Sequence, residues 1–202
     1  MSALTLLLQV SNGAPILALA EGENIRFDTR SDPAFEDNRD YRAMLEAGLR
    51  TLGAAVGDLE ILASDIGPGG LGATRTGAAF VNALGYALSK PVIGLPAFEL
   101  LGRTVWTGKG PVAILRKAAR PFVHFGIFEN NELVRYEYCE RDTALDAVKN
   151  LSNVDIAGNV PLDGYPAPLT NVADMGVMAK MAMHAPGLPS DARARPIVET
   201  LQ

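Results

Sequence analysis

Hydrophobic and polar positions alternate in short blocks along the first 27 residues. Apolar runs at 5–9, 16–20 and 25–27 are separated by the turn-forming residues Ser11-Asn12-Gly13 and by the polar segment 21–24. Short apolar runs joined by such turns are typical of β-hairpins. The N-terminal pattern therefore predicts an antiparallel meander of three strands.

From residue 41 onward the apolar spacing becomes helical and then alternates between helix and strand. Apolar residues at 41, 44, 45, 49 and 52 share one helical face, and Asn38 or Asp40 could cap the start while Gly53 ends the helix. After this helix the pattern predicts a strand at 58–64, a turn at 65–72, a helix from about 74 to 88, a strand at 91–95 and a helix from about 97 to 105. Such alternation predicts a crossover with parallel strand pairing.

The segment 107–111 contains two glycines and a proline and is the best candidate for a domain boundary. We therefore expect domains at 1–107 and 108–202. In the second, the pattern predicts strands at 112–115, 122–128, 132–138 and 154–157, a helix capped by Asp142 and a last helix from about 171 to 184. Antiparallel strands followed by helices thus occur once in each half.

Composition narrows the class of protein. The 202 residues are 48% hydrophobic, which is enough for a real core, yet no apolar run reaches the roughly 18 residues of a membrane span. The single cysteine, Cys139, excludes a disulfide framework, so we expect a cytoplasmic protein without membrane contact. The net charge of −5 gives no overall attraction to nucleic acid, so a partner would have to hold any RNA.

A glycine-rich loop between a predicted strand and a predicted helix is the outstanding local feature. It contains Gly67, Pro68, Gly69, Gly70 and Gly72. Glycines permit tight turns, and a helix N-terminus can bind an anion, so a phosphate cradle is one interpretation and a compact turn without ligand is the other. The loop lacks the Gly-Lys-Ser/Thr ending of a P-loop and a clean dinucleotide-binding spacing.

Arg75 lies one turn into the predicted helix, where a cation opposes the helix dipole. Either a bound anion or partner carboxylate compensates it, or it is simply solvated. The densest basic stretch, Arg116 and Lys117 with Arg120, could contact RNA or an acidic partner, or form a solvated strand edge.

Residues for catalysis or metal binding are sparse. His124 and His184 are far apart and lack metal-ligand spacing, and no serine lies in a G-x-S-x-G turn. Cys139 has no adjacent basic cluster to lower its pKa. We therefore predict no catalytic residue, no metal ligand and no cofactor.

The helices predicted at 41–52 and 74–88 suggest close packing. The first carries an apolar stripe, and the second is rich in small residues that let another helix approach. They could bury these faces in their own domain or form a symmetric seam with a second chain.

The segment 65–77, DIGPGGLGATRTG, resembles the GPGSFTGLRIG signature of the bacterial TsaB (YeaZ) family. The similarity continues without a gap through AAFVNALGYALSKPVIGLPAFELLGR, and LTLLLQVSNGAPILAL is similar to the family's first hairpin. It is looser after residue 110, where RPIVETLQ resembles the terminal segment of the family.

This resemblance implies an α/β protein with the actin-like ATPase (ASKHA) fold, made of two similar βα subdomains of which the second is reduced. It implies a non-catalytic subunit that pairs with a TsaD-like catalytic paralogue, with a TsaE-like ATPase in the complex, in threonylcarbamoylation of the tRNA adenosine next to the anticodon. Contact with tRNA would be indirect, and a homodimer would use the same helices. The implied interface residues are Tyr41, Met44, Leu45, Gly48, Gly77, Val81 and Gly85.

Several departures from the family pattern remove chemical groups. The aspartate of the family's first hairpin falls on Gln9, the Ser-Phe-Thr-Gly of its loop becomes residues 70–73, Gly-Leu-Gly-Ala, and the histidine of its first helix is missing. A neutral amide cannot supply the charge that organises a metal-bound phosphate. These losses favour a scaffold over a catalyst. Two alternatives stay open: a peptidase-like hydrolase acting on a partner protein, and a nucleotide-binding regulator that uses the glycine-rich loop.

Overall fold

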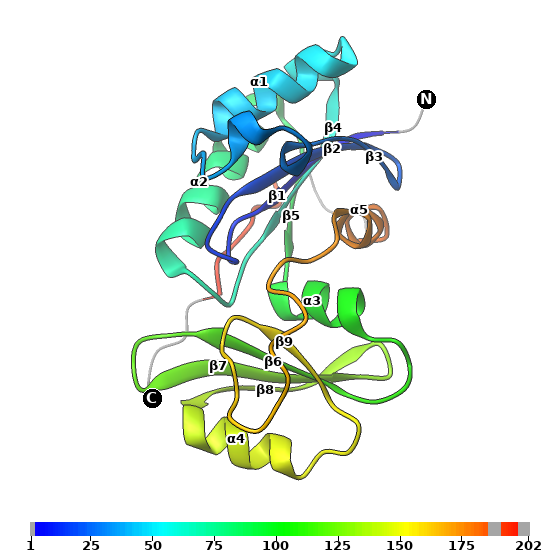
Figure 1. Cartoon of the computed structure of the whole chain (residues 1–202). Helices are drawn as coiled ribbons and strands as arrows, with labels where there is room; N and C mark the ends of the chain where they lie inside the picture. The colour runs from blue at the N-terminus through cyan, green and yellow to red at the C-terminus, as the bar shows by residue number, and fades with distance from the viewer. Residues whose placement is uncertain (1–2, 186–190, 198–202) are drawn as a thin grey trace.

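The computed structural model describes residues 3–185 and 191–197 and contains two β-sheets stacked one above the other (Figure 1). The first sheet has the strand order β3-β2-β1-β4-β5. Its strands are β1 (Leu4–Gln9), β2 (Ile16–Glu21), β3 (Asn24–Asp28), β4 (Leu59–Asp65) and β5 (Val92–Leu95). The strands β1, β2 and β3 pair antiparallel, whereas β4 pairs parallel with both β1 and β5. The predicted meander and the predicted crossover are both confirmed.

The second sheet repeats this arrangement with one strand fewer. Its order is β8-β7-β6-β9, which corresponds to β3-β2-β1-β4 of the first sheet, including the parallel pairing of β6 with β9. The strands are β6 (Val112–Lys117), β7 (Phe122–Glu129), β8 (Glu132–Glu140) and β9 (Asp155–Gly158). Two similar halves, the second reduced, are the architecture of the actin-like ATPase (ASKHA) fold, and this prediction is confirmed.

The helices begin and end close to the predicted positions, with three differences. They are α1 (Tyr41–Leu52), α2 (Leu71–Leu88), α3 (Ala97–Val105), α4 (Arg141–Lys149) and α5 (Met175–Met183). The helix α2 begins three residues early, so Gly72 lies in its first turn instead of the loop. The helix α4 starts after Glu140, so Asp142 is not its cap, and α5 starts late because the Asp174 carboxylate accepts hydrogen bonds from the N–H groups of its first turn.

The ends of α1 follow directly from the sequence. The Asp40 carboxylate accepts a hydrogen bond from the Ala43 N–H at 3.0 Å, and Gly53 ends the helix in the left-handed region at φ 63°. A short carboxylate at the N-cap and a glycine just past the last turn satisfy backbone groups that the helix leaves free. Between β3 and α1 the chain makes the short 3₁₀ turns η1 (Thr29–Ser31) and η2 (Pro33–Phe35), and η3 (Val56–Asp58) precedes β4.

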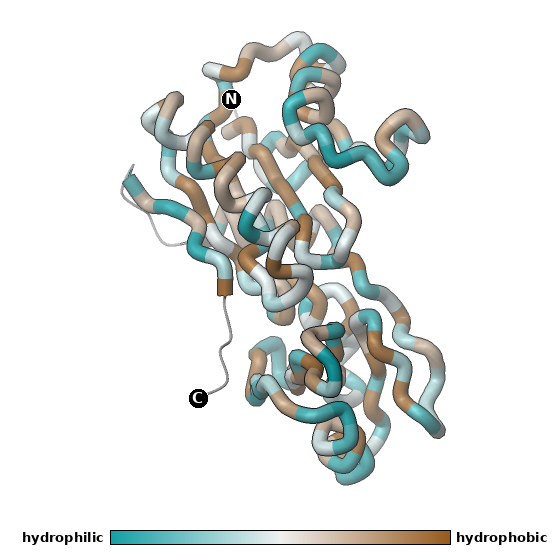
Figure 2. Tube along the Cα trace, turned by 90° about the vertical axis from the view of Figure 1, so that its left-hand side faces the viewer, coloured by the Kyte–Doolittle hydropathy of each residue, from teal (hydrophilic) through white to brown (hydrophobic). Residues whose placement is uncertain are grey.

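The helices and sheets form five layers. The helices α1 and α2 cover one face of the first sheet, α3 and α5 lie between the sheets, and α4 covers the outer face of the second (Figure 1). Three hydrophobic cores fill the four helix-sheet boundaries: one lies under α1 and α2, one surrounds α3 and α5 between the sheets, and one lies under α4. Figure 2 shows the hydrophobic stretches following the strands and the hydrophilic ones in the outer connections.

Two helices are exchanged between the halves. The helix α3 belongs to the first half by sequence but packs on the strands of the second sheet, whereas α5 follows the second half and packs on β1, β3 and β5. The predicted boundary at residues 107 and 108 falls in the α3–β6 connection, so this exchange holds its two sides together. No helix in residues 3–185 or 191–197 is long and apolar enough to cross a bilayer.

Candidate functional site

The carboxyl ends of β1, β4 and β6 converge between the two halves. The strand β1 ends at Gln9, β4 ends at Asp65, and Arg116 is the residue before the end of β6. In α/β proteins the carboxyl ends of parallel strands are where ligands bind. This cleft is therefore the candidate functional site.

Asp65 is completely buried and binds the turn between β1 and β2. Its carboxylate accepts hydrogen bonds from the Ser11 hydroxyl at 2.8 Å, from the Ser11 N–H at 3.1 Å and from the Val10 N–H at 3.2 Å. Burial raises the pKa of Asp65, while Arg116 and these hydrogen bonds act in the opposite direction. The carboxylate thus stabilises the turn of its own chain.

Arg116 is 1% exposed and connects four segments of the chain. One terminal nitrogen donates to the Ser11 hydroxyl and to the Pro68 carbonyl, the latter at 3.1 Å, and Nε donates to Asn171 Oδ1 at 3.1 Å. The other terminal nitrogen donates to the Asn171 carbonyl at 3.0 Å. Burial lowers the pKa of Arg116 to about 10, so the guanidinium remains charged at neutral pH.

The Ser11 hydroxyl joins the two charges. It donates its hydrogen to Asp65 and accepts from Arg116. A buried cation and a buried anion are tolerated only when they are paired and hydrogen-bonded, and here one hydroxyl supplies the link. The pair holds β1 and β4 of the first half against β6 of the second.

The sequence grouped Arg116 with Lys117 and Arg120 as a basic cluster on the surface, and this is wrong for Arg116. The alternation of β6 turns its side chain to the inner face of the sheet, where Val112 and Ile114 also point. Lys117 and Arg120 are exposed. The basic cluster is thus reduced to two residues, and its third member is structural.

Gln9, on which the resemblance places the family's first-hairpin aspartate, closes one end of the cleft. Its amide nitrogen donates to the Ala173 carbonyl at 3.2 Å, and its amide oxygen accepts from the Ala173 N–H at 2.9 Å. Its amide nitrogen also lies 3.7 Å from Met175 Sδ. A carboxylate could only accept, so it could not make both bonds to Ala173.

The glycine-rich loop packs against the chain itself. Gly67 and Pro68 are buried, and the Gly67 carbonyl accepts from the Ala97 N–H at 2.8 Å. The Gly70 N–H donates to the Ser11 carbonyl at 3.3 Å, and a Cβ atom at Gly69 would collide with that same carbonyl. These contacts account for glycine here by close approach of two backbones, as in a compact turn.

Arg75 is exposed on α2, and no acidic side chain in the described parts of the chain forms an ion pair with it. Its compensation by a bound anion or by a partner carboxylate stays a prediction. Gly72 is exposed beside it in the first turn of α2.

The seven residues expected at a partner interface all lie inside their own domain. A Cβ atom at Gly48 would lie 2.7 Å from Phe27, one at Gly77 would lie 2.8 Å from Val10, and one at Gly85 would collide with Val92. The larger members of the set, Tyr41, Met44, Leu45 and Val81, are between 0% and 8% exposed. In the isolated chain the apolar stripe of each helix thus faces the first sheet, and the use of these residues at a partner interface stays a prediction.

The remaining candidate groups are scattered. His124 lies on β7 with its Nδ1 2.9 Å from the Tyr136 hydroxyl, and His184 follows α5. Burial raises the pKa of the Cys139 thiol, which lowers its thiolate fraction. Within residues 3–185 and 191–197, no three histidine, cysteine or acidic side chains come together as a possible metal site.

Several residues of the cleft were not recognised from the sequence. Asp65 and Gln9 carried a signal, since each ends a buried strand of a parallel pair. Asn171 and Ala173 had no such signal in the sequence, because they lie in an irregular segment far from their partners. Ala173 is more than 160 positions from Gln9, and Asn171 is more than 50 from Arg116. Their role depends on tertiary structure alone.

Comparisons with known proteins give a family and a fold. The family model described as "TsaD: tRNA N6-adenosine threonylcarbamoyltransferase" matches residues 39–183. A crystal structure of a Pseudomonas aeruginosa protein described as similar to peptidase YeaZ matches with a TM-score of 0.70 and 18% identity over 97% of this chain and 99% of that one. YeaZ from Pseudomonas aeruginosa matches with a TM-score of 0.69 and 17% identity over 98% and 100%. No curated protein sequence matches.

The match to the family model spans well over half of the chain, and the likeness to YeaZ extends over nearly all of it. The resemblance of the segment 65–77 to the TsaB (YeaZ) signature is thereby confirmed. The chain belongs to the TsaD family and has the fold of its YeaZ (TsaB) relatives.

Proposed function

We propose that the chain is a non-catalytic scaffold subunit that pairs with a TsaD-like catalytic paralogue in threonylcarbamoylation of the tRNA adenosine next to the anticodon. The observation that carries this proposal is the cleft of a TsaD-family chain filled by its own side chains. Gln9 binds Ala173, Arg116 binds Asn171, and Asp65 binds Ser11.

The chemistry of these contacts opposes nucleotide binding in the cleft. A phosphate with a metal ion would need a free carboxylate near the first hairpin. Gln9 is neutral and uses both ends of its amide, and Asp65 is occupied by three donors. Displacing them would leave the Arg116 charge buried without its partner, which typically costs about 3–5 kcal/mol.

The exposed faces of α1 and α2 are the surface proposed for pairing. Figure 2 views the molecule from the side on which α2 lies in Figure 1. On α2 the exposed residues include Ala79 and Ala83, which permit close helix approach, and Tyr86, which is 79% exposed. Aromatic side chains of this kind often dominate the binding energy of an interface. On α1 the exposed Arg42 and Glu46 form an ion pair.

Size-exclusion chromatography of the chain with its TsaD-like partner tests this proposal. We expect a heterodimer with the native chain, its loss with Ala83→Arg, and no effect of the matched control Thr143→Arg, because Thr143 is exposed on the distant helix α4. Absence of a native heterodimer would contradict the pairing. A heterodimer that survives Ala83→Arg would contradict the surface.

Homodimer and heterodimer would compete, since both are proposed to use α1 and α2. The TsaE-like ATPase would join the TsaD-bound complex, and tRNA would be held mainly by the partner because the chain carries a net charge of −5. Titration of a homodimer with the TsaD-like chain should therefore dissociate it. A stable complex containing both interfaces would contradict this competition.

A peptidase-like hydrolase remains the second candidate, since one structural relative is described by its similarity to a peptidase. Inhibition of a proteolytic activity by a serine- or cysteine-directed reagent would support it. A nucleotide-binding regulator is the third, and calorimetric titration with ATP or ADP, with and without magnesium, tests it. For a scaffold we expect no proteolytic activity to inhibit and no heat of nucleotide binding.

A further inference from the structure

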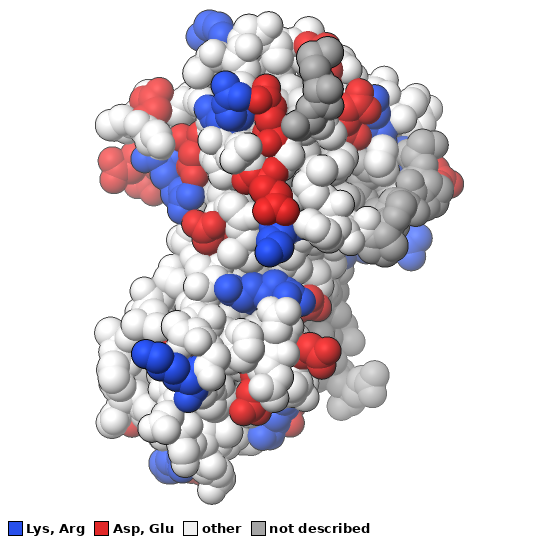
Figure 3. All heavy atoms as spheres, turned by 90° about the vertical axis from the view of Figure 1, so that its right-hand side faces the viewer, with Lys and Arg blue, Asp and Glu red and all other residues white. Residues whose placement is uncertain are grey.

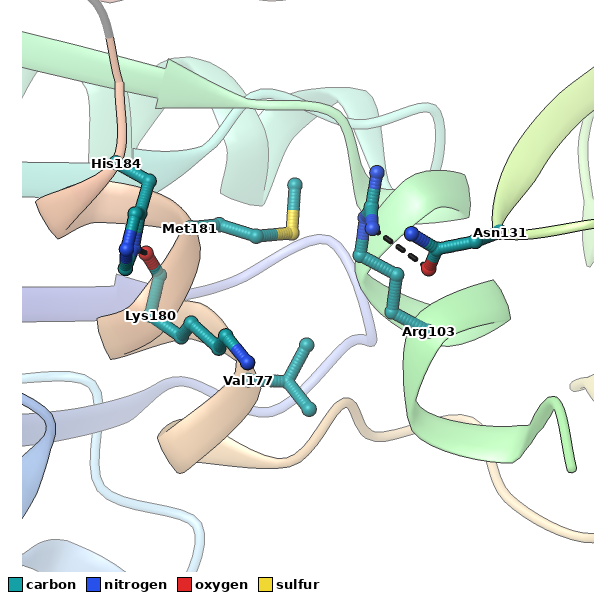
Figure 4. Close-up of a pocket in the computed structure, with 6 residues that line it drawn as sticks. All are labelled: Arg103, Asn131, Val177, Lys180, Met181 and His184. Carbon is teal, nitrogen blue, oxygen red and sulfur yellow. Dashed lines mark hydrogen bonds between the residues drawn. The ribbon is translucent and has the colours of Figure 1, made fainter.

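A cavity of about 470 Å³ lies between the two sheets, beyond the face of the first sheet that α1 and α2 cover (Figure 1). It is formed by α3, by the turn between β7 and β8, and by α5. The lining residues are Arg103, Asn131, Val177, Lys180, Met181 and His184. Figure 4 shows Arg103 and Asn131 on one side, and on the other Val177, Lys180 and Met181 of α5 with His184, which follows the helix. None of them takes part in the interdomain cleft described above.

The charge of this cavity is one-sided. Arg103 and Lys180 contribute two cations, and its lining contains no carboxylate. On the same face, two groups of basic side chains lie at the waist of the molecule, with acidic side chains above and below them (Figure 3). Two nearby acids are separate from the cavity: Asp174 caps α5 through the N–H groups of Gly176 and Val177, and Glu99 lines an adjoining cavity. An anion between the two cations would be favourable.

Arg103 is held in place before any ligand arrives. A terminal nitrogen donates to Asn131 Oδ1 at 2.7 Å, and the guanidinium lies 5.9 Å from the centre of the Phe128 ring. Its Nε is buried and has no acceptor among the described residues. A fixed guanidinium loses little entropy on binding, and its fork matches phosphate oxygens.

The opposite wall comes from α5. Lys180 is exposed, and its ammonium group makes no ion pair in the described parts of the chain. Val177 and Met181 add an apolar surface beside it (Figure 4). The His184 Nδ1–H donates to the Lys180 carbonyl at 2.8 Å, which fixes the imidazole at the rim. A charged pole next to an apolar wall is typical of sites for small organic anions.

We propose that this cavity binds a small phosphorylated molecule, with its phosphate between Arg103 and Lys180 and its apolar part against Val177 and Met181. The cavity lies where the exchanged helices face each other, since α3 packs on the second sheet and α5 on the first. A ligand there would bind both halves at once and stabilise their mutual arrangement.

Isothermal titration calorimetry on the full chain tests this site with AMP, adenosine and inorganic phosphate as probes. AMP should bind, adenosine should not, and phosphate alone should bind more weakly than AMP. Lys180→Gln and Asn131→Gly should each weaken AMP binding about tenfold, which is ~1.4 kcal/mol. Glycine is chosen at Asn131 because its φ is 65°. The control Lys149→Gln removes a charge from α4 and should leave binding unchanged.

Three results would overturn the proposal. AMP binding that is absent, or that is unaffected by Lys180→Gln, would show that this cavity does not take a phosphorylated molecule. Phosphate binding as tightly as AMP would remove the role of Val177 and Met181. Thermal melts of each variant without ligand check that it is folded. Lys180→Gln should melt at the temperature of the native chain, because Lys180 is exposed and glutamine is a good helix former.

Discussion

At the scale of single residues, the buried Arg116 and Asp65 explain why the cleft is closed. Each charge is costly in the interior, and each is compensated through Ser11 and the backbone. Neither residue can be replaced alone without leaving the other charge uncompensated. The pair therefore behaves as one unit, and its disruption should be felt by both halves.

Arg116→Met should lower the free energy of unfolding by about 3–5 kcal/mol, because it leaves the Asp65 carboxylate buried without its cation. Asp65→Asn should have a similar effect, and the double variant should be more stable than the sum of the two changes predicts. Chemical denaturation of the four proteins measures this. Additive losses would show that the two charges do not interact.

The pH dependence of the free energy of unfolding tests the contribution of Asp65 separately from that of Arg116. Because burial raises the pKa of Asp65, the native state binds its proton more tightly than the unfolded chain does. The contribution of this group to stability is thus complete below the ordinary aspartate pKa and declines as the pH rises through the raised value. Comparison of the native chain with Asp65→Asn across the acid range should show this decline in the native chain only; parallel curves would contradict it.

Cys139 is expected to be a slow nucleophile. Burial raises its pKa, so at pH 8 the native chain should be alkylated by iodoacetamide several-fold more slowly than the unfolded chain. The rate should continue to rise above pH 9. A rate that is already maximal at neutral pH would indicate an activated thiol and would favour the peptidase-like alternative.

At the scale of elements, the sequence predicted the helices well but not the direction of their packing. The apolar spacing of residues 41–52 matches the extent of α1; of the two caps open from the sequence, Asn38 and Asp40, the structure has Asp40, and Gly53 ends the helix as predicted. The same spacing could not tell whether the stripe faces the chain's own sheet or a partner. Burial of Tyr41, Met44 and Leu45 shows that it faces the sheet.

Two substitutions on α2 separate these possibilities. Gly85→Ala should lower the free energy of unfolding by about 1–3 kcal/mol, because its Cβ collides with Val92 beneath the helix. Ala83→Ser, two positions away on the exposed face, should change it by less than about 0.5 kcal/mol. Thermal or urea denaturation of both variants measures the difference. Equal effects would contradict the placement of Gly85 on the buried face of α2 and of Ala83 on its exposed face.

The strands were predictable for a similar reason, since short apolar runs between turn residues left few alternatives. The start of α2 was not predictable. The helix begins at Leu71 and includes Gly72, within a segment whose glycines indicate a loop. The side of β6 on which Arg116 lies was predictable in principle from strand alternation. Its pairing with Asn171, more than 50 residues away, was not.

At the scale of the whole molecule, two similar halves are joined in three ways. The exchanged helices α3 and α5 pack across the boundary, and Arg116 and Gln9 bind segments of the other half. In a two-domain enzyme that opens and closes around its ligand, such contacts would have to break in each cycle. A chain that is held closed is better suited to present a constant surface to a partner.

The central claim is therefore that this chain supports a reaction that its partner catalyses. The most direct measurement is threonylcarbamoylation of tRNA by the TsaD-like and TsaE-like proteins, with this chain added native, as Ala83→Arg or as Thr143→Arg. The native chain and Thr143→Arg should restore modification, Ala83→Arg should fail, and the chain alone should be inactive. Modification that proceeds equally well without the chain, or that the chain performs by itself, would contradict the proposal.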